Sequence, residues 1–308
     1  MSISIKNISK SYGKVKALTD ISFDIKQGEL FGLIGPDGAG KTTLFRILTT
    51  LLFPDKGEAT VADYDIIKDY KDIRSHAGYM PGRFSLYQDL TVAENLTFFA
   101  TIFGTTIEEN YDLIKDIYMQ IEPFKNRRAG KLSGGMKQKL ALSCALIHKP
   151  KVLFLDEPTT GVDPVSRKEF WEMLKRLQKK DITILVSTPY MDEAELCDRI
   201  ALITDGEILQ VDTPQAIMQA FPKTIYKVRT SETYRLIKDL KTYPKTHSAY
   251  PFGEYLHFTS TDENLDPEEL IHFLEQKKHT QIEVEKIDAS IEDTFMELTH
   301  TREVNAHD

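Results

Sequence analysis

The chain has 308 residues, 41% of them hydrophobic and 28% charged, an ordinary composition for a globular protein with a sizeable core. Its formal net charge is −8, from 39 Lys and Arg against 47 Asp and Glu, which argues against a general nucleic-acid binder. The two cysteines, Cys144 and Cys197, lie far apart and lack metal-type spacing. Neither a disulfide framework nor a zinc site is therefore indicated, and we expect no nucleic-acid partner.

The first five residues lack the basic head and apolar stretch of a signal peptide. No uninterrupted apolar segment approaches the roughly 18 residues needed to span a bilayer. A reducing cytosol fits this pattern best. If the protein works at a membrane, we expect another chain to supply the membrane-spanning part.

Apolar residues alternate at 3–5 and again at 21–25, and both patterns predict strands. A turn at Gln27-Gly28 leads into the apolar run 30–34, which predicts a buried strand. Residues 35–40 are rich in glycine, and residues 41–48 follow with helical spacing. The order strand, glycine-rich loop, helix is the context that a phosphate-binding loop requires.

The pattern turns helical from about 91 to 147 and predicts a mostly helical insert. Two bounded apolar runs, 152–155 and 182–186, predict parallel strands separated by a helix at 166–179. A hairpin follows over 200–209, with its turn at Asp205-Gly206.

Beyond residue 221 the composition shifts to short strand-like pieces between polar helices, with an amphipathic helix at 291–298. No catalytic motif is visible there. We predict one domain over 1–221, with a helical subdomain at about 83–150, and an accessory α+β domain over 222–308.

One segment matches the phosphate-loop pattern in full. In such a loop the backbone N–H groups close around the phosphates, the lysine reaches the β- and γ-phosphates, and the hydroxyl after it ligates Mg²⁺. The predicted nucleotide-binding residues are Gly35, Pro36, Asp37, Gly38, Ala39, Gly40, Lys41, Thr42 and Thr43. The side chain of the acidic Asp37 has to point outward, away from the phosphates.

Asp156 and Glu157 cap the predicted strand 152–155. A carboxylate at the end of a buried strand can hold Mg²⁺ through water, and its neighbour can orient the attacking water as a general base. We therefore predict Thr42 and Asp156 as metal residues, and Lys41 and Glu157 as catalytic residues. ATP and Mg²⁺ are the predicted substrate and cofactor.

The segment Leu132-Ser133-Gly134-Gly135-Met136 stands about twenty residues before Asp156. A serine hydroxyl and glycine N–H groups at a helix start make an anion site. Together with the phosphate loop, this segment resembles the signature motif of the ATP-binding cassette (ABC) family. The resemblance covers about residues 1–215 and implies a P-loop NTPase with a mixed sheet, an antiparallel β subdomain and a helical subdomain.

Within that family the signature motif serves the nucleotide of a second cassette. The resemblance therefore gives Ser133, Gly134 and Gly135 to a partner's ATP, and Asp163 to the segment that crosses the dimer interface. Tyr12 resembles the aromatic residue that stacks on adenine. The residues 289–295 also resemble the tail of exporter-type members, a less specific match.

The resemblance implies the ATP-hydrolysing subunit of a bacterial exporter, peripheral at the cytoplasmic face of the inner membrane. Its partners are membrane permease subunits and a second cassette, which is either an identical or a different chain. The transported molecule is chosen by the permease. Non-transport members that act in translation or repair carry two cassettes in one chain or long coiled coils, and this chain has neither.

The chain departs from the family at two positions. Gly82 follows Tyr79-Met80-Pro81 where the family usually has a glutamine, and Pro189 follows Ser187-Thr188 where it usually has a histidine. Neither replacement supplies a polar side chain. We expect slow hydrolysis, because one lost transition-state contact commonly costs about 10² to 10³ in rate. The alternative is a catalytically impaired, mainly regulatory half of a heterodimer.

Two further groups of residues, one near Gly82 and one aromatic, have alternative roles. Arg83 or Gln88 could substitute for the missing glutamine, although surface exposure is the default for both. The aromatics Phe98, Phe99 and Phe103 are more often core residues at such spacing, but by resemblance their segment forms a permease-binding groove.

Overall fold

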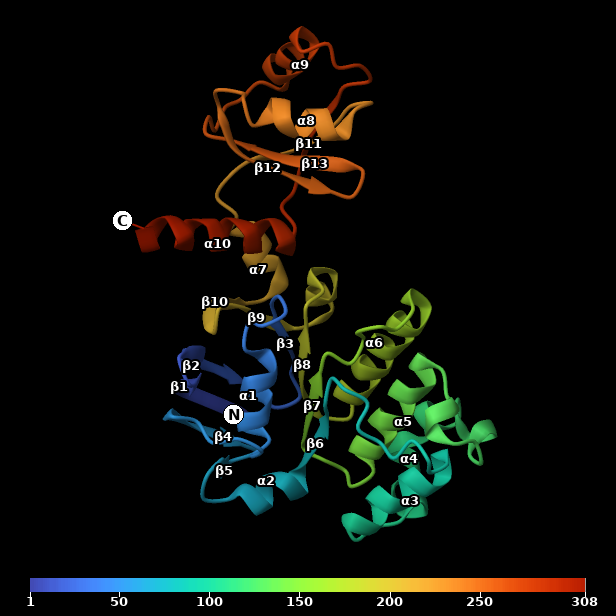
Figure 1. Ribbon diagram of the computed structural model, residues 1–308. Coiled ribbons are helices and arrows are strands. Elements are labelled where there is room, and N and C mark those ends of the chain that lie inside the picture. Colours follow the sequence, from blue (N-terminus) through green and yellow to red (C-terminus); the bar gives the residue numbers. More distant parts are fainter. Residues whose placement is uncertain (308) are drawn as a thin grey trace. The chain divides into compact units, whose positions relative to one another are not determined.

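The computed structural model describes residues 1–307, with side chains as far as Arg302. The chain forms two compact units, Met1–Pro214 and Gln215–Asp308 (Figure 1). The division falls after the first residue of helix α7 (Pro214–Gln219), whereas the boundary proposed from the sequence falls after the helix.

The first unit is built on a six-stranded mixed sheet with the order β10-β9-β3-β8-β7-β6. All neighbouring pairs are parallel except β9 and β10, which form the predicted hairpin. Because the central strands run in one direction, β3, β7 and β8 end at the same edge, where their loops meet. The strands are β3 (Leu30–Ile34), β6 (Ala77–Met80), β7 (Val152–Asp156), β8 (Thr183–Thr188), β9 (Arg199–Thr204) and β10 (Glu207–Asp212).

An antiparallel sheet, β2-β1-β4-β5, covers one side of helix α1, which follows the glycine-rich loop (Figure 1). Leu44, Phe45, Ile47 and Leu48 of α1 are fully buried in one core with residues of both sheets. This packing fixes the position of the loop that precedes α1. The elements are β1 (Ile3–Tyr12), β2 (Val15–Ile25), β4 (Lys56–Val61), β5 (Tyr64–Asp65), α1 (Lys41–Leu48) and α2 (Tyr70–His76).

The predicted helical insert lies on the other side of the central sheet (Figure 1). Two of its helices begin with capping boxes, Thr91 with Glu94 and Thr106 with Glu109, in which side chain and backbone satisfy each other's hydrogen bonds. Its helices are α3 (Val92–Ile102), α4 (Ile107–Tyr118), η1 (Glu122–Phe124), η2 (Ala129–Lys131) and α5 (Gly134–Leu146); α6 (Pro164–Gln178) and η3 (Met191–Leu196) follow later in the chain.

The second unit has the element order β11-α8-β12-β13-α9-β14 and an antiparallel sheet in the order β12-β13-β11-β14. This is the ferredoxin-like arrangement. Leu236 and Leu240 of α8 and Leu270 and Leu274 of α9 are fully buried in its core. The elements are β11 (Ile225–Arg229), α8 (Thr233–Leu240), β12 (Thr246–Phe252), β13 (Tyr255–Ser260), α9 (Pro267–Gln276), β14 (Glu283–Ile287) and α10 (Ile291–His307).

Among the residues described, no helix has both the length and the apolar content that a membrane span requires.

Candidate functional site

The glycine-rich loop connects β3 to α1, and two of its glycines are required by close packing. A Cβ on Gly35 would lie 2.0 Å from the carbonyl oxygen of Ile203, and one on Gly40 would lie 2.4 Å from that of Ala17. Gly40 also has φ of 101°, a conformation that strains any L side chain. The loop therefore keeps its shape only with glycine at both positions.

The remaining loop residues differ in exposure. Pro36, Asp37 and Gly38 are exposed, which is compatible with the outward orientation expected for the Asp37 carboxylate. Ala39 is buried and Thr43 is half-buried in the first turn of α1.

Lys41 is 3% exposed, and its ammonium group lies inside the loop. Its Nζ donates to the carbonyl oxygens of Gly35 at 2.8 Å and Pro36 at 2.9 Å. It also forms an ion pair with Oε1 of Glu157 at 3.2 Å. The two predicted catalytic side chains therefore meet, from elements more than one hundred residues apart in the sequence.

Asp156 ends β7 and is 2% exposed. Its Oδ2 accepts a hydrogen bond from Oγ1 of Thr42 at 2.9 Å, and its Oδ1 accepts one from Oγ of Ser187 at 2.7 Å. The predicted pair of metal residues is thus in direct contact. Hard oxygen donors of this kind fit Mg²⁺, which usually takes one or two protein ligands and completes its shell with phosphates and water.

Glu157 follows β7 with φ of 51°, in the left-handed region that costs energy for a residue other than glycine. Its backbone N–H is held by Ser187, through Oγ at 3.0 Å and the carbonyl oxygen at 3.1 Å. This strained turn directs the carboxylate to Lys41 and leaves its side chain 23% exposed. Glu157 is therefore fixed by its backbone while its carboxylate remains accessible to water.

A cavity of about 460 Å³ opens beside these groups. Tyr79 on β6 lines it, and burial together with the nearby Asp156 carboxylate raises the pKa of Tyr79 to about 12. The phenol therefore stays neutral at physiological pH. The lining residues are Thr42, Arg46, Tyr79, Pro81, Gly82, Arg83, Asp156 and Glu157.

The signature residues form a second group. Ser133 caps helix α5, and its Oγ accepts from the backbone N–H of Met136 at 3.4 Å. A Cβ on Gly135 would lie 2.7 Å from Oγ of Ser166, so α5 starts tightly against the first turn of α6. Ser133, Gly134 and Gly135 are all within the described residues, and none lines the cavity beside Glu157.

Asp163 belongs to this second group. It caps α6, its carboxylate accepts from the N–H of Ser166 at 3.0 Å, and this hydrogen bond lowers the pKa of the Asp163 carboxyl. Asp163 is exposed, as is Tyr12, which ends β1 and is 46% exposed. The structure thus joins the phosphate loop to Asp156 and Glu157, and joins the signature to the Asp163 segment.

The two departures from the family pattern lie shortly after β6 and β8, and of the two only Gly82 is among the described residues that line the cavity. Gly82 lines it, and a Cβ built on Gly82 would lie 3.0 Å from the carbonyl oxygen of Asp156. Pro189 directly follows β8, which carries Ser187. Neither position offers a polar side chain, so other residues have to supply any contact made there.

Sequence reasoning missed the role of Ser187, which contacts both acidic residues. Its signal was topological: β8 lies next to β7 in the sheet, so Asp156 and Ser187 are paired residues at the ends of adjacent parallel strands. The sequence alone does not give this register.

This phosphate-loop strand and the acidic pair beside it define a P-loop nucleotide-binding site. The family model described as "ABC transporter" matches residues 18–160. With the relatives that follow, this places the chain in the family of ABC transporter ATP-binding proteins.

The chain is 48% identical over 205 residues to the probable multidrug ABC transporter ATP-binding protein YbhF of Escherichia coli, a match that covers 66% of this chain but 36% of that relative. It is 38% identical over 221 residues to the Nod factor export ATP-binding protein I of Burkholderia lata, covering 71% and 73% of the two chains. A solved dimer of the ATP-binding cassette MJ0796, bound to ADP and Pi after hydrolysis, matches with a TM-score of 0.62 at 26% identity, over 68% of this chain and 98% of that one.

Proposed function

We propose that this chain binds ATP with Mg²⁺, hydrolyses it, and thereby drives export through separate membrane permease subunits. The observation that carries the proposal is the contact network of Lys41, Thr42, Asp156, Glu157 and Ser187, which assembles a nucleotide site from three strand ends. Relatives named for multidrug and Nod factor export support the direction of transport.

Mg²⁺ bound by Thr42 and Asp156 would neutralise charge on the β- and γ-phosphates. Glu157 accepts the proton of the attacking water, whose oxygen bonds to the γ-phosphorus as the bond to the ADP oxygen breaks. Lys41 stabilises the phosphate charge, and its partners Gly35 and Pro36 hold it in the loop. The products are ADP and inorganic phosphate.

Ser187→Ala should weaken Mg²⁺-dependent hydrolysis, because Ser187 orients the carboxylate of Asp156 and the backbone of Glu157. Loss of a residue that orients a metal ligand typically costs 10- to 100-fold in metal affinity or activity, on the order of the effect expected here. The measurement is ATP turnover across a range of Mg²⁺ concentrations. Ser187→Ala should need more Mg²⁺ for half-maximal rate.

The matched control is Ser143→Ala. Ser143 is equally buried but donates only to the backbone of its own helix, through the carbonyl oxygen of Lys139. An unchanged Mg²⁺ requirement in Ser187→Ala would show that the Ser187 contact does not position the metal carboxylate.

The proposal includes a second cassette. None of the signature residues Ser133–Gly135 lines the cavity of their own chain. The Ser133 hydroxyl accepts from Met136 at the start of α5, and its own proton could be donated to an anion brought by a partner. The solved dimer of a similar cassette supports this arrangement. ATP would then be bound between the phosphate loop of one subunit and the signature of the other.

A second candidate function rests on Gly82, which lines the cavity, and on Pro189, which follows β8; the chain lacks the usual glutamine and histidine at these positions. In a heterodimer this chain would be the impaired, mainly regulatory half. Its intact signature at Ser133 would still complete a competent site on the other chain. Glu157-dependent turnover of the purified chain separates the two functions.

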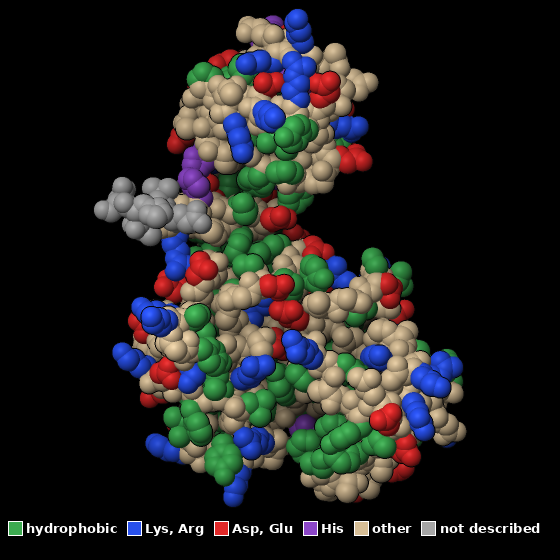
Figure 2. Space-filling view, viewed as in Figure 1, with side chains coloured by type: hydrophobic (Ala, Val, Ile, Leu, Met, Phe, Trp, Pro, Cys, Tyr) green, Lys and Arg blue, Asp and Glu red, His purple; other side chains and the backbone are tan. Residues whose placement is uncertain are grey.

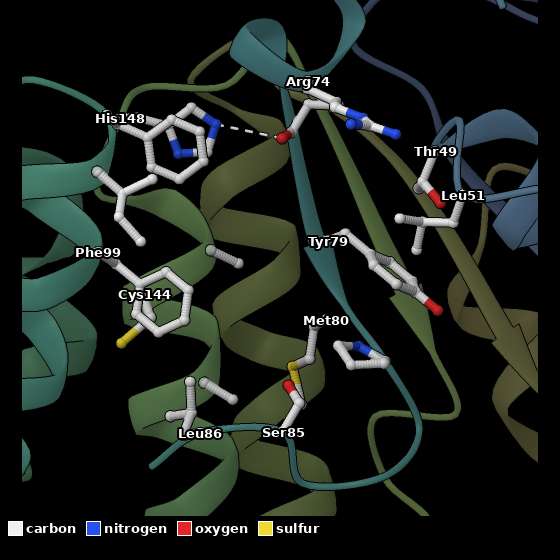
Figure 3. A pocket seen from close by; sticks show the side chains of 16 residues that line it. Thr49, Leu51, Arg74, Tyr79, Met80, Ser85, Leu86, Phe99, Cys144 and His148 are labelled. Atoms are coloured by element: carbon white, nitrogen blue, oxygen red, sulfur yellow. Dashed lines mark hydrogen bonds between the residues drawn. The ribbon is translucent and has the colours of Figure 1, made fainter. Parts of the chain in front are cut away.

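A permease-binding groove is proposed on the side of the unit that carries α3. An apolar cavity of about 420 Å³ is lined there by Leu51, Tyr79, Phe99, Phe103 and His148, among others (Figure 3). Figure 2 shows apolar side chains gathered over α3. None of the three phenylalanines 98, 99 and 103 is fully buried; Phe99 and Phe103 line this cavity, whereas Phe98 packs against Tyr87.

The groove also contacts the nucleotide site through two residues, because Tyr79 and Pro81 line both cavities. Figure 3 shows the side chains of Phe99 and His148 on one side of the cavity and those of Arg74 and Leu51 on the other. His148 stacks on Phe103, and burial lowers the pKa of His148 to about 4, so the ring is neutral. Apart from Arg74, the lining labelled in Figure 3 is uncharged and largely apolar or aromatic, which suits an apolar helix of a permease.

Leu51→Asp should abolish recovery of a polytopic membrane protein with this chain from detergent-solubilised membranes. Leu51 is 59% exposed and lines the groove, so a charge there opposes apolar docking without entering the core. Mass spectrometry of the purified complex is the measurement. Met119→Asp is the control, because Met119 is 60% exposed but does not line the groove; equal recovery with both variants would rule out this groove.

By this proposal the chain acts at the cytoplasmic face of the inner membrane as a peripheral subunit. The second unit, which we treat as an accessory domain, then has no part in nucleotide chemistry.

A further inference from the structure

The cavity beside Glu157 contains two guanidinium groups that the family pattern does not explain. Arg46 lies on α1 one turn after Thr42, and Arg83 directly follows Gly82. Within residues 1–302, neither side chain has an ion-pair partner or a side-chain hydrogen bond, whereas Lys41 is held by three oxygen atoms. Both guanidinium groups are therefore available to an anion that enters the cavity.

The two carboxylates at the cavity would repel the phosphates of ATP, so a positively charged group is needed there. Asp156 and Glu157 bring two carboxylates into the space that has to accept the most negative part of ATP. Gly82 and Pro189 contribute no polar side chain to offset that repulsion. A guanidinium is permanently charged and carries several donors in a planar fork, which matches phosphate oxygens.

Arg83 is the better placed of the two. A Cβ built on Gly82 would lie 3.0 Å from the carbonyl oxygen of Asp156 and 3.8 Å from Cβ of Glu157. The backbone at Gly82 is therefore next to the acidic pair, and Arg83 is the residue that follows it. Arg46 lies near the Tyr79 phenol, whose pKa its charge lowers slightly against the effect of burial. Gln88, the other proposed substitute, does not line the cavity, and its backbone instead accepts from the N–H of Gly130.

We propose that Arg83 binds the terminal phosphate of ATP and takes the place of the missing glutamine as a catalytic residue. This inference rests on the proposed ATPase function. As water attacks the γ-phosphorus and the bond to ADP breaks, Arg83 stabilises the negative charge on the transferred phosphoryl group, while Glu157 receives the proton.

The test compares ATP with ADP, which lacks the phosphate that Arg83 contacts. Binding of each nucleotide is measured by calorimetry on the full chain carrying Glu157→Gln, so that ATP is not consumed. Arg83→Gln should weaken ATP binding by about 10- to 100-fold and leave ADP binding unchanged, because a charge-assisted contact is lost only with ATP. Arg83→Lys keeps the charge but loses the planar set of guanidinium donors, so its ATP affinity should lie between those of the unchanged residue and Arg83→Gln.

Two matched variants complete the design. Arg176→Gln removes an exposed guanidinium from α6 outside the cavity and should change the binding of neither ATP nor ADP. Arg46→Gln removes the other guanidinium of the same cavity and should weaken ATP binding less than Arg83→Gln does.

Equal loss of ATP and ADP binding in Arg83→Gln, no loss of either, or an ATP-specific loss found in Arg46→Gln instead would overturn the role of Arg83. If the chain without any Arg83 change bound no ATP, and Lys41→Met altered nothing, the proposed ATPase function itself would fail. In Glu157-containing protein, Arg83→Gln should also reduce turnover by about 10²- to 10³-fold.

Discussion

Glu157→Gln should lower ATP turnover by at least about 10²-fold while leaving ATP binding intact. The amide has nearly the same size as the carboxylate, so the turn at φ 51° and the backbone contacts to Ser187 persist. What is lost is the proton acceptor, whose contribution is typically 10²- to 10⁴-fold. Phosphate release by the purified chain measures turnover, and calorimetry measures binding.

The control for this substitution is Glu172→Gln, an exposed glutamate on α6. It should leave both quantities unchanged. Turnover that survives in Glu157→Gln would mean that another group accepts the proton. Absence of turnover in the unmodified chain would instead favour the regulatory half of a heterodimer.

Asp293→Ala should destabilise the second unit by about 3–5 kcal/mol, because each buried donor left without its acceptor costs about 1–3 kcal/mol. Asp293 is 1% exposed, and its carboxylate accepts from Nδ1 of His257 at 2.7 Å, from the N–H and Oγ of Ser290, and from the hydroxyl of Tyr250. These contacts tie the start of α10 to strands β12 and β13. Alanine would leave several buried donors without a partner.

Hydrogen exchange resolved by mass spectrometry measures this effect, because it reports β12 and β13 separately from the first unit. The amides of these strands should lose protection in Asp293→Ala. Asp293→Asn, which keeps the size and one acceptor, should lose less. Unchanged protection in both variants would show that this cluster does not stabilise the unit.

The same carboxylate predicts a pH dependence. Burial alone would raise the pKa of Asp293, but the hydrogen bonds from His257, Ser290 and Tyr250 outweigh it and lower the pKa from 3.8 to about 2. A lowered pKa stabilises the fold above the unfolded value, and this stabilisation is lost as the pH falls through the folded value. The difference in free energy of unfolding between the wild type and Asp293→Asn should therefore shrink between pH 4 and pH 2.

Local patterns predicted the elements that carry the candidate nucleotide site. The loop and α1 follow from glycines, a lysine and helical spacing within fourteen residues of β3, and the buried run before Asp156 marks β7. Local patterns did not predict strand β6, because it is short and contains Gly78. The missing side chain of Gly78 lets the backbone of α5 approach. Local patterns did not predict strand β12 either, because it is an edge strand that contains polar residues and Pro251.

Contacts between distant segments could not be predicted in the same way. The contact of Ser187 with Asp156 depends on the register of two parallel strands, which no local pattern specifies. Arg46 and Arg83 line one cavity although one lies on α1 and the other follows β6. The phenylalanines near α3 have helical spacing typical of core, but Phe99 and Phe103 line an open groove and only Phe98 packs against Tyr87. Spacing predicts which residues share a helix face, but it does not predict what covers that face.

We propose above all that ATP is bound between two cassettes, with the signature of one completing the site of the other. Analytical ultracentrifugation of the chain carrying Glu157→Gln tests it most directly. We expect a monomer without nucleotide, a dimer with ATP and Mg²⁺, and no dimer when Ser133→Arg is added, although ATP still binds. A chain that binds ATP but stays monomeric at every concentration, or that dimerises regardless of Ser133, would contradict the claim.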